Sequence, residues 1–507
     1  MREESTASEQ HVLAARLDLN IEEIQDRFGR SQDLVVKEMT YGTTDIALVY
    51  IDGLVDTHVL NQSIIASLLN GDKHSRSLPS YSTPANLLDF FKEEVLSIGD
   101  IGQLKEMSCL FNSLLSGDVV LLAEGHADGL HIGAAGWEDR NVGEPTTQTV
   151  IRGPMEAFTE NIRTNTALIR RKIKDPQLWL EGRQIGTVTK TNVAVMYMRQ
   201  IADEDLVQEV FSRLDKINID SILESGYIEE FIQDKTWTPF PTVYNSERPD
   251  TIAAGLLEGK VAIIVDGTPF VLLVPALFVQ FFQSAEDYYQ RADVSSLLRL
   301  MRFMAFFITM LSPSLYIAVT TFHQEMLPTN LLINLAAQRE GVPFPAFIEA
   351  LMMEVTFEIL REAGVRMPKT VGQAVSIVGT LVIGQSAVEA GIVSAVMVII
   401  VAITAISSFV IPAAGMSISI RMIRFILMGL AASFGLIGIM VGLLLLVIHL
   451  SCLRSFGVPF LSSLSPFHGK DQKDTLFRLP WPLMTTRPMS TAKENLWRQP
   501  ETPKPKT

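Results

Sequence analysis

Between Thr370 and Ile420, more than fifty positions contain a single charged residue, Glu389. Water-soluble domains carry charges at much shorter intervals, whereas a membrane-spanning helix needs about 20 apolar residues in succession. Two further runs without formal charge, 303–324 and 425–453, lie in the same part of the chain. The C-terminal third is therefore expected to lie in a lipid bilayer.

We expect about four membrane spans, near residues 303–324, 371–387, 390–411 and 425–450. Pro313 predicts a kink in the first span. Basic residues outside the first and last spans favour cytoplasmic N and C termini; they are Arg291, Arg299, Arg302, Arg454, Lys470 and Lys473. The basic residues between the first two spans oppose this orientation, although glutamates match much of their charge; they are Arg339, Arg361, Arg366 and Lys369.

The first 300 residues carry most of the charge and resemble a water-soluble region. The net charge of −14 argues against nucleic acid as a partner, because phosphate binding needs clustered Lys and Arg. The two cysteines, Cys109 and Cys452, are too few for a disulfide framework. The polar start has no apolar segment typical of a cleaved signal peptide.

Two pairs of similar segments suggest that the soluble region is duplicated. Residues 44–51 (TDIALVYI) resemble 191–198 (TNVAVMYM), and 117–125 (GDVVLLAEG) resemble 259–267 (GKVAIIVDG). Each first segment is predicted to be a buried strand followed by a helix, which is typical of α/β units. By the same comparison, 261–282 is expected to be a strand–turn–strand rather than a fifth span, with Asp266-Gly267 at the turn.

The expected fold is an α/β soluble region of two similar subdomains followed by an all-α polytopic membrane domain. The predicted boundaries are a variable tail (1–29), a first α/β subdomain (30–150), a connecting helix (151–188), a second α/β subdomain (189–290), a membrane domain (291–455) and a cytoplasmic tail with a Pro-rich end (456–507).

The connecting segment 152–173 is basic and has apolar residues near helical spacing, with Pro154 in a position suited to a first helical turn. Two interpretations remain open. The segment is a bridging helix with a solvated charged face, or it contacts an acidic neighbour, such as a second copy of the chain. The candidate contact residues are Arg152, Arg163, Arg170 and Arg171.

Gly435, Gly438 and Gly442 in the last expected span are candidates for close helix packing, because small residues allow helices to approach one another. They would serve contacts between copies of the chain in an oligomer. The alternative is that glycine is simply common in membrane helices.

Glu354, Glu358 and Glu362 are spaced four apart, so they lie on one face of a helix within the apolar segment 344–364. In a ring of identical subunits they would form stacked acidic rings that line a cation pore. The alternative is a surface helix on which Glu358 pairs with Arg361 and Glu362 pairs with Arg366. Glu354 distinguishes the two, because it has no Lys or Arg three or four residues away.

No enzymatic motif was found: the sequence has no phosphate-binding Gly-rich loop, nucleophile elbow or zinc-protease motif. His126 and His131 are the closest pair among eight dispersed histidines, and no further ligands complete a metal site. We therefore expect no catalytic residues, no metal and no cofactor.

Several longer stretches resemble the A subunit of spore-germination receptors of the GerA type. They include 152–165 (RGPMEAFTENIRTN), 247–250 (ERPD), 257–270, 281–289, 342–345, 362–368 and 455–459. The resemblance covers about residues 30–485, nearly the whole chain.

This resemblance implies a protein of the inner membrane of dormant bacterial spores that takes part in nutrient sensing. It also implies two partners, a multi-pass B subunit that binds the nutrient and a lipoprotein C subunit. The A subunit would assemble into a homo-oligomeric ring that forms an ion path. Alternatives are a secondary transporter, although four spans are few for one, and a non-conducting signalling scaffold.

Overall fold

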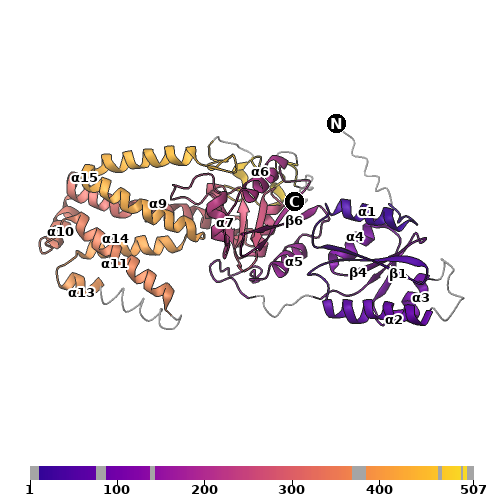
Figure 1. The fold of residues 1–507 in the computed structure, drawn as a ribbon. Helices are drawn as coiled ribbons and strands as arrows, with labels where there is room; N and C mark the ends of the chain where they lie inside the picture. Colours follow the sequence, from indigo (N-terminus) through magenta and orange to yellow (C-terminus); the bar gives the residue numbers. More distant parts are fainter. Residues whose placement is uncertain are drawn as a thin grey trace, which may run out of the picture. The chain divides into compact units, whose positions relative to one another are not determined.

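The computed structural model describes residues 11–75, 87–136, 143–367, 384–465, 471–492 and 495–498. The chain divides into two compact units (Figure 1). The α/β unit comprises Met1–Gln233, Val243–Pro275 and Thr486–Pro500, and the helical unit comprises Asp234–Thr242, Ala276–Thr485 and Glu501–Thr507. The predicted division into an α/β region and a helical C-terminal region is confirmed.

The first sheet of the α/β unit has the strand order β1-β2-β4-β5-β3, with every neighbouring pair antiparallel. Its strands are β1 (Leu34–Tyr41), β2 (Thr44–Ile51), β3 (Ile101–Leu104), β4 (Val119–Ala123) and β5 (Gly129–Ile132). The accompanying helices are α1 (Leu17–Arg27), α2 (Ala66–Ser75), α3 (Leu87–Phe90) and α4 (Met107–Ser116). Apolar residues of β2 and β4 contribute to two separate cores, so both faces of the sheet are covered.

The second sheet repeats this topology, with the order β6-β7-β9-β10-β8. Its strands are β6 (Leu178–Ile185), β7 (Thr191–Met198), β8 (Tyr244–Ser246), β9 (Val261–Val265) and β10 (Val271–Val274). The helices are α5 (Ile162–Lys172), α6 (Glu204–Asp215), α7 (Ser225–Ile232) and α8 (Pro249–Leu256).

The two sheets also share their register. Leu48 of β2 lies opposite Leu121 of β4, and Val195 of β7 lies opposite Ile263 of β9. These are the strands that the two pairs of similar sequences predicted. The segment 261–282 begins with the buried strands β9 and β10, as expected, and is not a membrane helix.

Three expected boundaries differ from the structure. Residues 17–27, within the expected tail, form α1, whose Leu17, Ile21 and Ile24 pack into the core of the first subdomain. The expected connecting helix contains strand β6 of the second sheet. Its helix α5 begins only at Ile162, because the Asn161 side chain accepts hydrogen bonds from the first-turn amides of Arg163 and Thr164. The segment that contains Pro154 is not helical.

Besides residues 234–242, the helical unit contains the 3-10 turns 278–282 and 285–288, followed by the long helix α9 (Ala292–Phe322). Next come α10 (Thr329–Arg339), α11 (Ala346–Arg366), α13 (Gly384–Glu389), α14 (Ala395–Phe409) and α15 (Ala414–Cys452), and then the short strands β11 (Arg454–Ser455) and β12 (Val458–Pro459). Residues from α9, α10, α11, α14 and α15 share one apolar core.

Helix α15 reverses its direction at Gly435, where φ is 59° and ψ is −140°. A Cβ on Gly438 would lie 2.2 Å from the Leu430 carbonyl oxygen, and one on Gly442 would lie 2.5 Å from Leu427 Cδ2. Because eight or more residues separate these positions, such contacts require the chain to fold back on itself. Helix α15 is therefore a hairpin of two arms, 414–434 and 436–452, and the single span expected over 425–450 is wrong.

Among the described residues, two helices are long and apolar enough to cross a membrane, α9 and α15. Helix α14 is apolar but has only 15 residues. The span expected at 371–387 lies largely outside the described residues. Pro313 lies within α9 and its side chain is buried there. The kink expected at this residue stays a prediction.

We predict that Gly435→Ala lowers the free energy of unfolding of the helical unit by about 1–3 kcal/mol, because only glycine adopts this backbone conformation without strain. A Cβ at this position would also lie 2.8 Å from His323 Cε1. The midpoint of thermal unfolding in detergent measures the effect. Gly429→Ala is the control, because a Cβ there meets nothing within 4 Å. Equal midpoints for the two variants would contradict the role of Gly435.

Candidate functional site

Helix α11 carries three acidic side chains toward the interior of the helical unit. Glu349 and Glu354 are each 0% exposed, and Glu358 is partly buried. Apolar residues of the same helix, such as Ala346 and Ala350, belong to the surrounding core. Burying a carboxylate in such surroundings is costly unless a cation or hydrogen-bond donors meet it.

Glu354 and Glu358 meet two arginines of the first arm of α15. Arg424 Nη2 lies 2.8 Å from Glu354 Oε2 and 3.2 Å from Glu358 Oε1. Arg421 donates to the other oxygen of Glu358. We call these four residues the charge cluster. It joins α11 to α15 through two carboxylates and two guanidinium groups.

The charge cluster does not use all of its hydrogen-bonding capacity. Within the described part of the chain, Arg421 Nε, Arg424 Nε and both carboxylate oxygens of Glu354 have no hydrogen bond of good geometry, although Glu354 is ion-paired. A buried polar atom that lacks a hydrogen bond is costly in an interior of low dielectric constant. The charge cluster is therefore an incompletely satisfied network.

Arg424 lies at the midpoint of the first arm of α15, which is about 30 Å long at 1.5 Å per residue. That length matches the hydrocarbon thickness of a bilayer. If this arm crosses a membrane, the charge cluster lies near the bilayer centre. Ionisable groups at such depth are rare and usually serve transport or sensing.

Glu349 forms a second acidic position one turn before the charge cluster. Its Oε1 accepts hydrogen bonds from the backbone amide of Ser394, at 2.6 Å, and from the Ser394 hydroxyl. Ser394 is the N-cap of α14, so the carboxylate also faces the positive end of that helix. Arg339 lies 3.9 Å from the other Glu349 oxygen. Glu349 thus stabilises a helix start that is buried inside the unit, and its role escaped the sequence analysis.

The structure separates the three glutamates that the sequence placed on one face. Glu362 is exposed and pairs with Arg366 at 2.7 Å, as the surface interpretation expected. Glu358 pairs with Arg421 and Arg424 instead of the expected Arg361. The Arg361 guanidinium lies 4.9 Å from the centre of the Phe409 ring. Glu354 has a partner after all, but the partner comes from another helix.

Gly438 and Gly442 lie against the first arm of their own hairpin. Close packing at these glycines is therefore intramolecular in this structure. A contact between copies through the same surface would require the hairpin to open.

A separate buried network lies where α9 begins. Asp287 accepts hydrogen bonds from Arg299 Nε at 2.9 Å and from Arg302 Nη1 at 2.8 Å. Arg299 Nη1 also donates to Asp474 at 2.7 Å. Arg299 and Arg302, which the sequence analysis treated as flanking charges, therefore fasten α9 to the segment that precedes it and to the C-terminal tail.

In the α/β unit, the basic helix α5 meets acidic residues of the first subdomain. Arg170 is fully buried; it pairs with Asp33 through two nitrogens and donates to the Leu178 carbonyl oxygen at 3.0 Å. Arg163 pairs with Asp52, and Arg171 lies 3.7 Å from Glu156. The acidic neighbour is thus part of the same chain. Arg170 is inaccessible to a second copy, and Arg152 is exposed.

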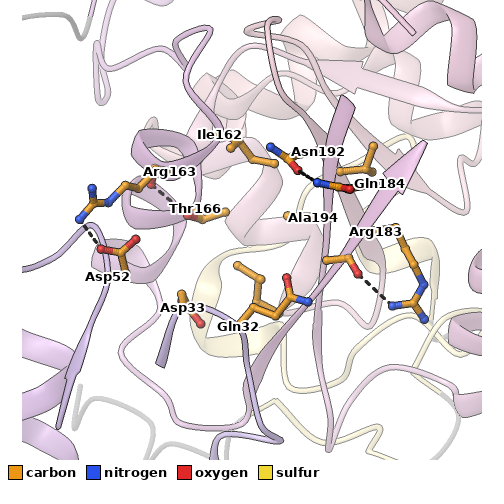
Figure 2. A pocket seen from close by; sticks show the side chains of 13 residues that line it. Gln32, Asp33, Asp52, Ile162, Arg163, Thr166, Arg183, Gln184, Asn192 and Ala194 are labelled. Atoms are coloured by element: carbon orange, nitrogen blue, oxygen red, sulfur yellow. Dashed lines mark hydrogen bonds and ion pairs between the residues drawn. The ribbon is translucent and has the colours of Figure 1, made fainter. Parts of the chain in front are cut away.

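A pocket of about 390 Å³ lies at this joint between the subdomains (Figure 2). Its polar lining includes Asp33, Asp52, Arg163 and Arg183. Each of these charged side chains has a partner: Asp33 binds Arg170, Asp52 binds Arg163, and Arg183 bonds to Asp215. The pocket therefore presents paired charges and is less suited to a charged ligand than an unpaired site would be.

The segment 247–250 stabilises the chain between the two sheets. Glu247 accepts hydrogen bonds from Thr147 and Gln148, while Arg248 binds Asp250 at 2.6 Å and the Pro154 carbonyl oxygen at 2.9 Å. Burial raises the pKa of the Glu247 carboxyl, but the hydrogen bonds from Thr147 and its neighbours outweigh burial and hold the pKa below its ordinary value. The segments 152–154 and 247–250 are thus linked structurally through Arg248 and Pro154.

Within the described ranges, no three His, Cys, Asp or Glu side chains are arranged to hold a metal ion. The charge cluster is therefore an electrostatic contact, in which two carboxylates of α11 pair with two guanidinium groups of α15.

The chain matches the family described as "Bacillus/Clostridium GerA spore germination protein" over residues 22–490. It is 50% identical to Spore germination protein KA of Bacillus subtilis, covering 96% of this chain and 89% of that protein. It is 45% identical to the Uncharacterized membrane protein YfkQ of Bacillus subtilis, covering 95% of this chain and 93% of that protein.

A solved structure is also similar, the N-terminal domain of the A subunit of the Bacillus megaterium spore germinant receptor GerK3. It is 40% identical and covers 53% of this chain and 98% of that domain, with a TM-score of 0.42.

We predict that Asp33→Ala loosens the joint between the subdomains by about 3–5 kcal/mol, because it leaves Arg170 buried without its carboxylate. Hydrogen–deuterium exchange of α5 and β6 measures the free energy of opening. Asp52→Ala is the matched control: its partner Arg163 is partly exposed, so a loss below about 1 kcal/mol is expected. Equal effects of the two substitutions would contradict the proposed difference.

We also predict that Glu354 and Arg424 are energetically coupled by about 1–3 kcal/mol. The test is a double-mutant cycle with Glu354→Gln and Arg424→Gln, measured as thermal stability in detergent. Each single variant should be destabilised, and the double variant should lose less than the sum. The matched pair Glu362→Gln and Arg366→Gln lies exposed on the same helix and should couple by less than about 0.5 kcal/mol. Additive losses at Glu354 and Arg424 would show that they do not interact.

Proposed function

Because the chain belongs to the GerA family of spore germination proteins, we propose that it is the A subunit of a nutrient germinant receptor in the inner membrane of the spore. In this proposal it acts together with a multi-pass B subunit that binds the nutrient and a lipoprotein C subunit. Several copies form a ring, and the helical units of the ring enclose a gated ion path.

The observation that carries the proposal is the charge cluster in the middle of an apolar helical unit. A chain without a transport or sensing role gains little from two arginines and two glutamates there, since apolar residues of similar size usually give equal or greater stability. The cluster is instead suited to two states, one in which the four charges pair and one in which they face a path filled with water.

We propose that the paired arrangement is the closed state. Glu354 is buried in it, so an ion cannot reach its carboxylate. Movement of the first arm of α15 away from α11 would withdraw Arg424 and expose Glu354 and Glu358. In a ring, these carboxylates would repeat around the axis and attract cations. The role of the acidic residues therefore depends on which partner they hold.

In this proposal the chain keeps four crossings. Two of them, α9 and α14, overlap the spans expected at 303–324 and 390–411, and the two arms of α15 take the place of the single span expected at 425–450. Helix α9 ends beside Gly435, where the hairpin reverses, and the second arm of α15 returns toward its open end. Helix α14 ends at Phe409, and the first arm of α15 follows it after a short connection. Crossings by α9, α14 and the two arms would leave both chain termini on one side, which we take to be the cytoplasm.

A pore requires more than one copy, because four crossings cannot easily enclose one. Arg152 remains our candidate for a contact between copies, since it is exposed, whereas Arg163 and Arg171 have partners within the chain. The glycines of α15 are not part of this contact in the closed state.

Purified protein in lipid vesicles, with and without its partner subunits, provides the test. Ion flux that follows the ion gradient alone supports a channel. Flux that requires a second solute supports a transporter. Absence of flux in a complex that still binds nutrient supports a signalling scaffold and would overturn the channel proposal.

We predict that Glu354→Gln increases cation release in the absence of nutrient by about fivefold or more, because it weakens the closed state. The measurement is cation efflux from spores that contain normal amounts of the variant protein, and from vesicles. Glu362→Gln is the control, since Glu362 is exposed and lies outside the charge cluster. Unchanged efflux in the Glu354 variant would remove this residue from the gate.

A further inference from the structure

Residues 234–242 connect α7 with β8 of the second sheet, yet they belong to the helical unit. They lie at the open end of the α15 hairpin. We call this segment the strap. Thr238 Oγ1 lies 2.9 Å from His449 Nε2 near the end of the second arm, and Ser419 near the start of the first arm donates to the Pro239 carbonyl oxygen. The strap is thus fixed to both arms.

The strap carries an apolar side chain that the described part of the chain leaves uncovered. Trp237 is 92% exposed although its neighbour Thr238 is anchored. Lys235 and Arg454 are exposed as well, and Asp234 joins their two segments by accepting a hydrogen bond from the Phe456 amide at 2.6 Å. One indole and two cations therefore lie close to the end of a long apolar helix.

The surface of α15 changes character at the same level. Exposed apolar side chains on the second arm continue through Val447 and Ile448. Exposed Ser451 and Arg454 follow within two turns. His449, which binds the strap, lies between the two regions, so Trp237 stands where the helix surface passes from apolar to polar.

A second exposed tryptophan stands at the corresponding border of α9. Trp481 is 44% exposed and donates to the Tyr288 carbonyl oxygen at 3.3 Å. Its segment is held to the first turns of α9, where Ser296 bonds with the backbone of Arg478. On α9 the exposed residues change from Arg291 and Asp293 to Val294 and Leu297.

We propose that the strap is a membrane-contact element: the Trp237 indole lies among lipid headgroups, Lys235 and Arg454 bind anionic headgroups, and Trp481 marks the same interface on α9. Tryptophan prefers this zone because its ring is apolar while its N–H needs a polar partner. Basic residues next to a span attract anionic lipids. The inference rests on the membrane location in the proposed function and adds the depth of insertion and the lipid chemistry.

The strap would also explain why the chain leaves the α/β unit between α7 and β8. A segment fixed to both arms of the hairpin and to the lipid surface holds the open end of the hairpin in place. It also connects that end covalently to the second sheet on both sides, through Gln233 and Val243.

The test uses the full chain in vesicles and its tryptophan fluorescence. Lipids brominated near the headgroup should quench the fluorescence more than lipids brominated near the chain end. Trp237→Phe and Trp481→Phe should each remove part of the shallow quenching. Trp497→Phe should remove none, although Trp497 is 67% exposed, because it belongs to the α/β unit.

The anionic preference is tested with brominated phosphatidylglycerol against brominated phosphatidylcholine at equal mole fractions. The Trp237 part of the quenching should be stronger with the anionic lipid, and the double variant Lys235→Gln and Arg454→Gln should abolish the difference. A local enrichment of roughly fivefold per cation is expected.

Two outcomes would overturn the inference. Shallow quenching that is unchanged in both Trp237→Phe and Trp481→Phe would place neither indole in the headgroups. Shielding of Trp237 from both brominated lipid and aqueous iodide would place a protein surface there instead. Flotation of the vesicles after an alkaline wash is measured separately: protein that fails to float would contradict the membrane location itself rather than the role of the strap.

Discussion

Four arginines are among the largest fully buried side chains of the molecule, Arg170, Arg248, Arg299 and Arg424. A guanidinium stays charged at any physiological pH, so each must find a carboxylate inside the protein. Arg170 finds Asp33, Arg248 finds Asp250, Arg299 finds Asp287 and Asp474, and Arg424 finds Glu354 and Glu358. The tertiary structure depends on these arginines, because each contacts a segment distant in the sequence; Arg248 does so through the Pro154 carbonyl oxygen rather than through Asp250.

The arginines differ in how completely their partners satisfy them. Arg170 and Arg248 also donate to backbone carbonyl oxygens, and such well-bonded pairs fix one geometry. Arg424 shares a single nitrogen between two carboxylates, and its Nε lacks a hydrogen bond in the described part of the chain. The first kind of pair is suited to a rigid joint, and the second to a contact that is made and broken. This contrast supports a structural role for the pairs of the α/β unit and underlies the proposal that the charge cluster acts as a switch.

The sequence predicted those features that depend on local pattern. Two matching pairs of apolar segments were enough to find β2, β4, β7 and β9 and the duplication, because buried strands read as continuous apolar runs. The first strands β1 and β6 were missed because their burial is mixed, and α1 was missed because it lies outside the similar segments. The pair Glu362 and Arg366 was predicted because its spacing is that of one helical turn. Arg424 could not be identified as the partner of Glu354, because about 70 residues separate them and spacing says nothing about contacts between helices.

The reversal at Gly435 could not be predicted from the sequence for a different reason. It also changes which surfaces of the helical unit are available to other molecules. An apolar helix with several glycines looks the same whether the glycines serve packing between copies, packing within a hairpin or a turn, since hydropathy carries no information on φ. Once α15 is a hairpin, Gly435, Gly438 and Gly442 face neighbouring helices, and the exposed large side chains of the two arms are apolar and largely aliphatic. Lipid covers such a surface without specific contacts, whereas assembly into a ring needs polar or shaped contacts to set its register. In the proposed ring, specific association between copies is therefore expected from charged positions and exposed loops rather than from the α15 arms, which would leave the arms free to move against lipid in the proposed gating step.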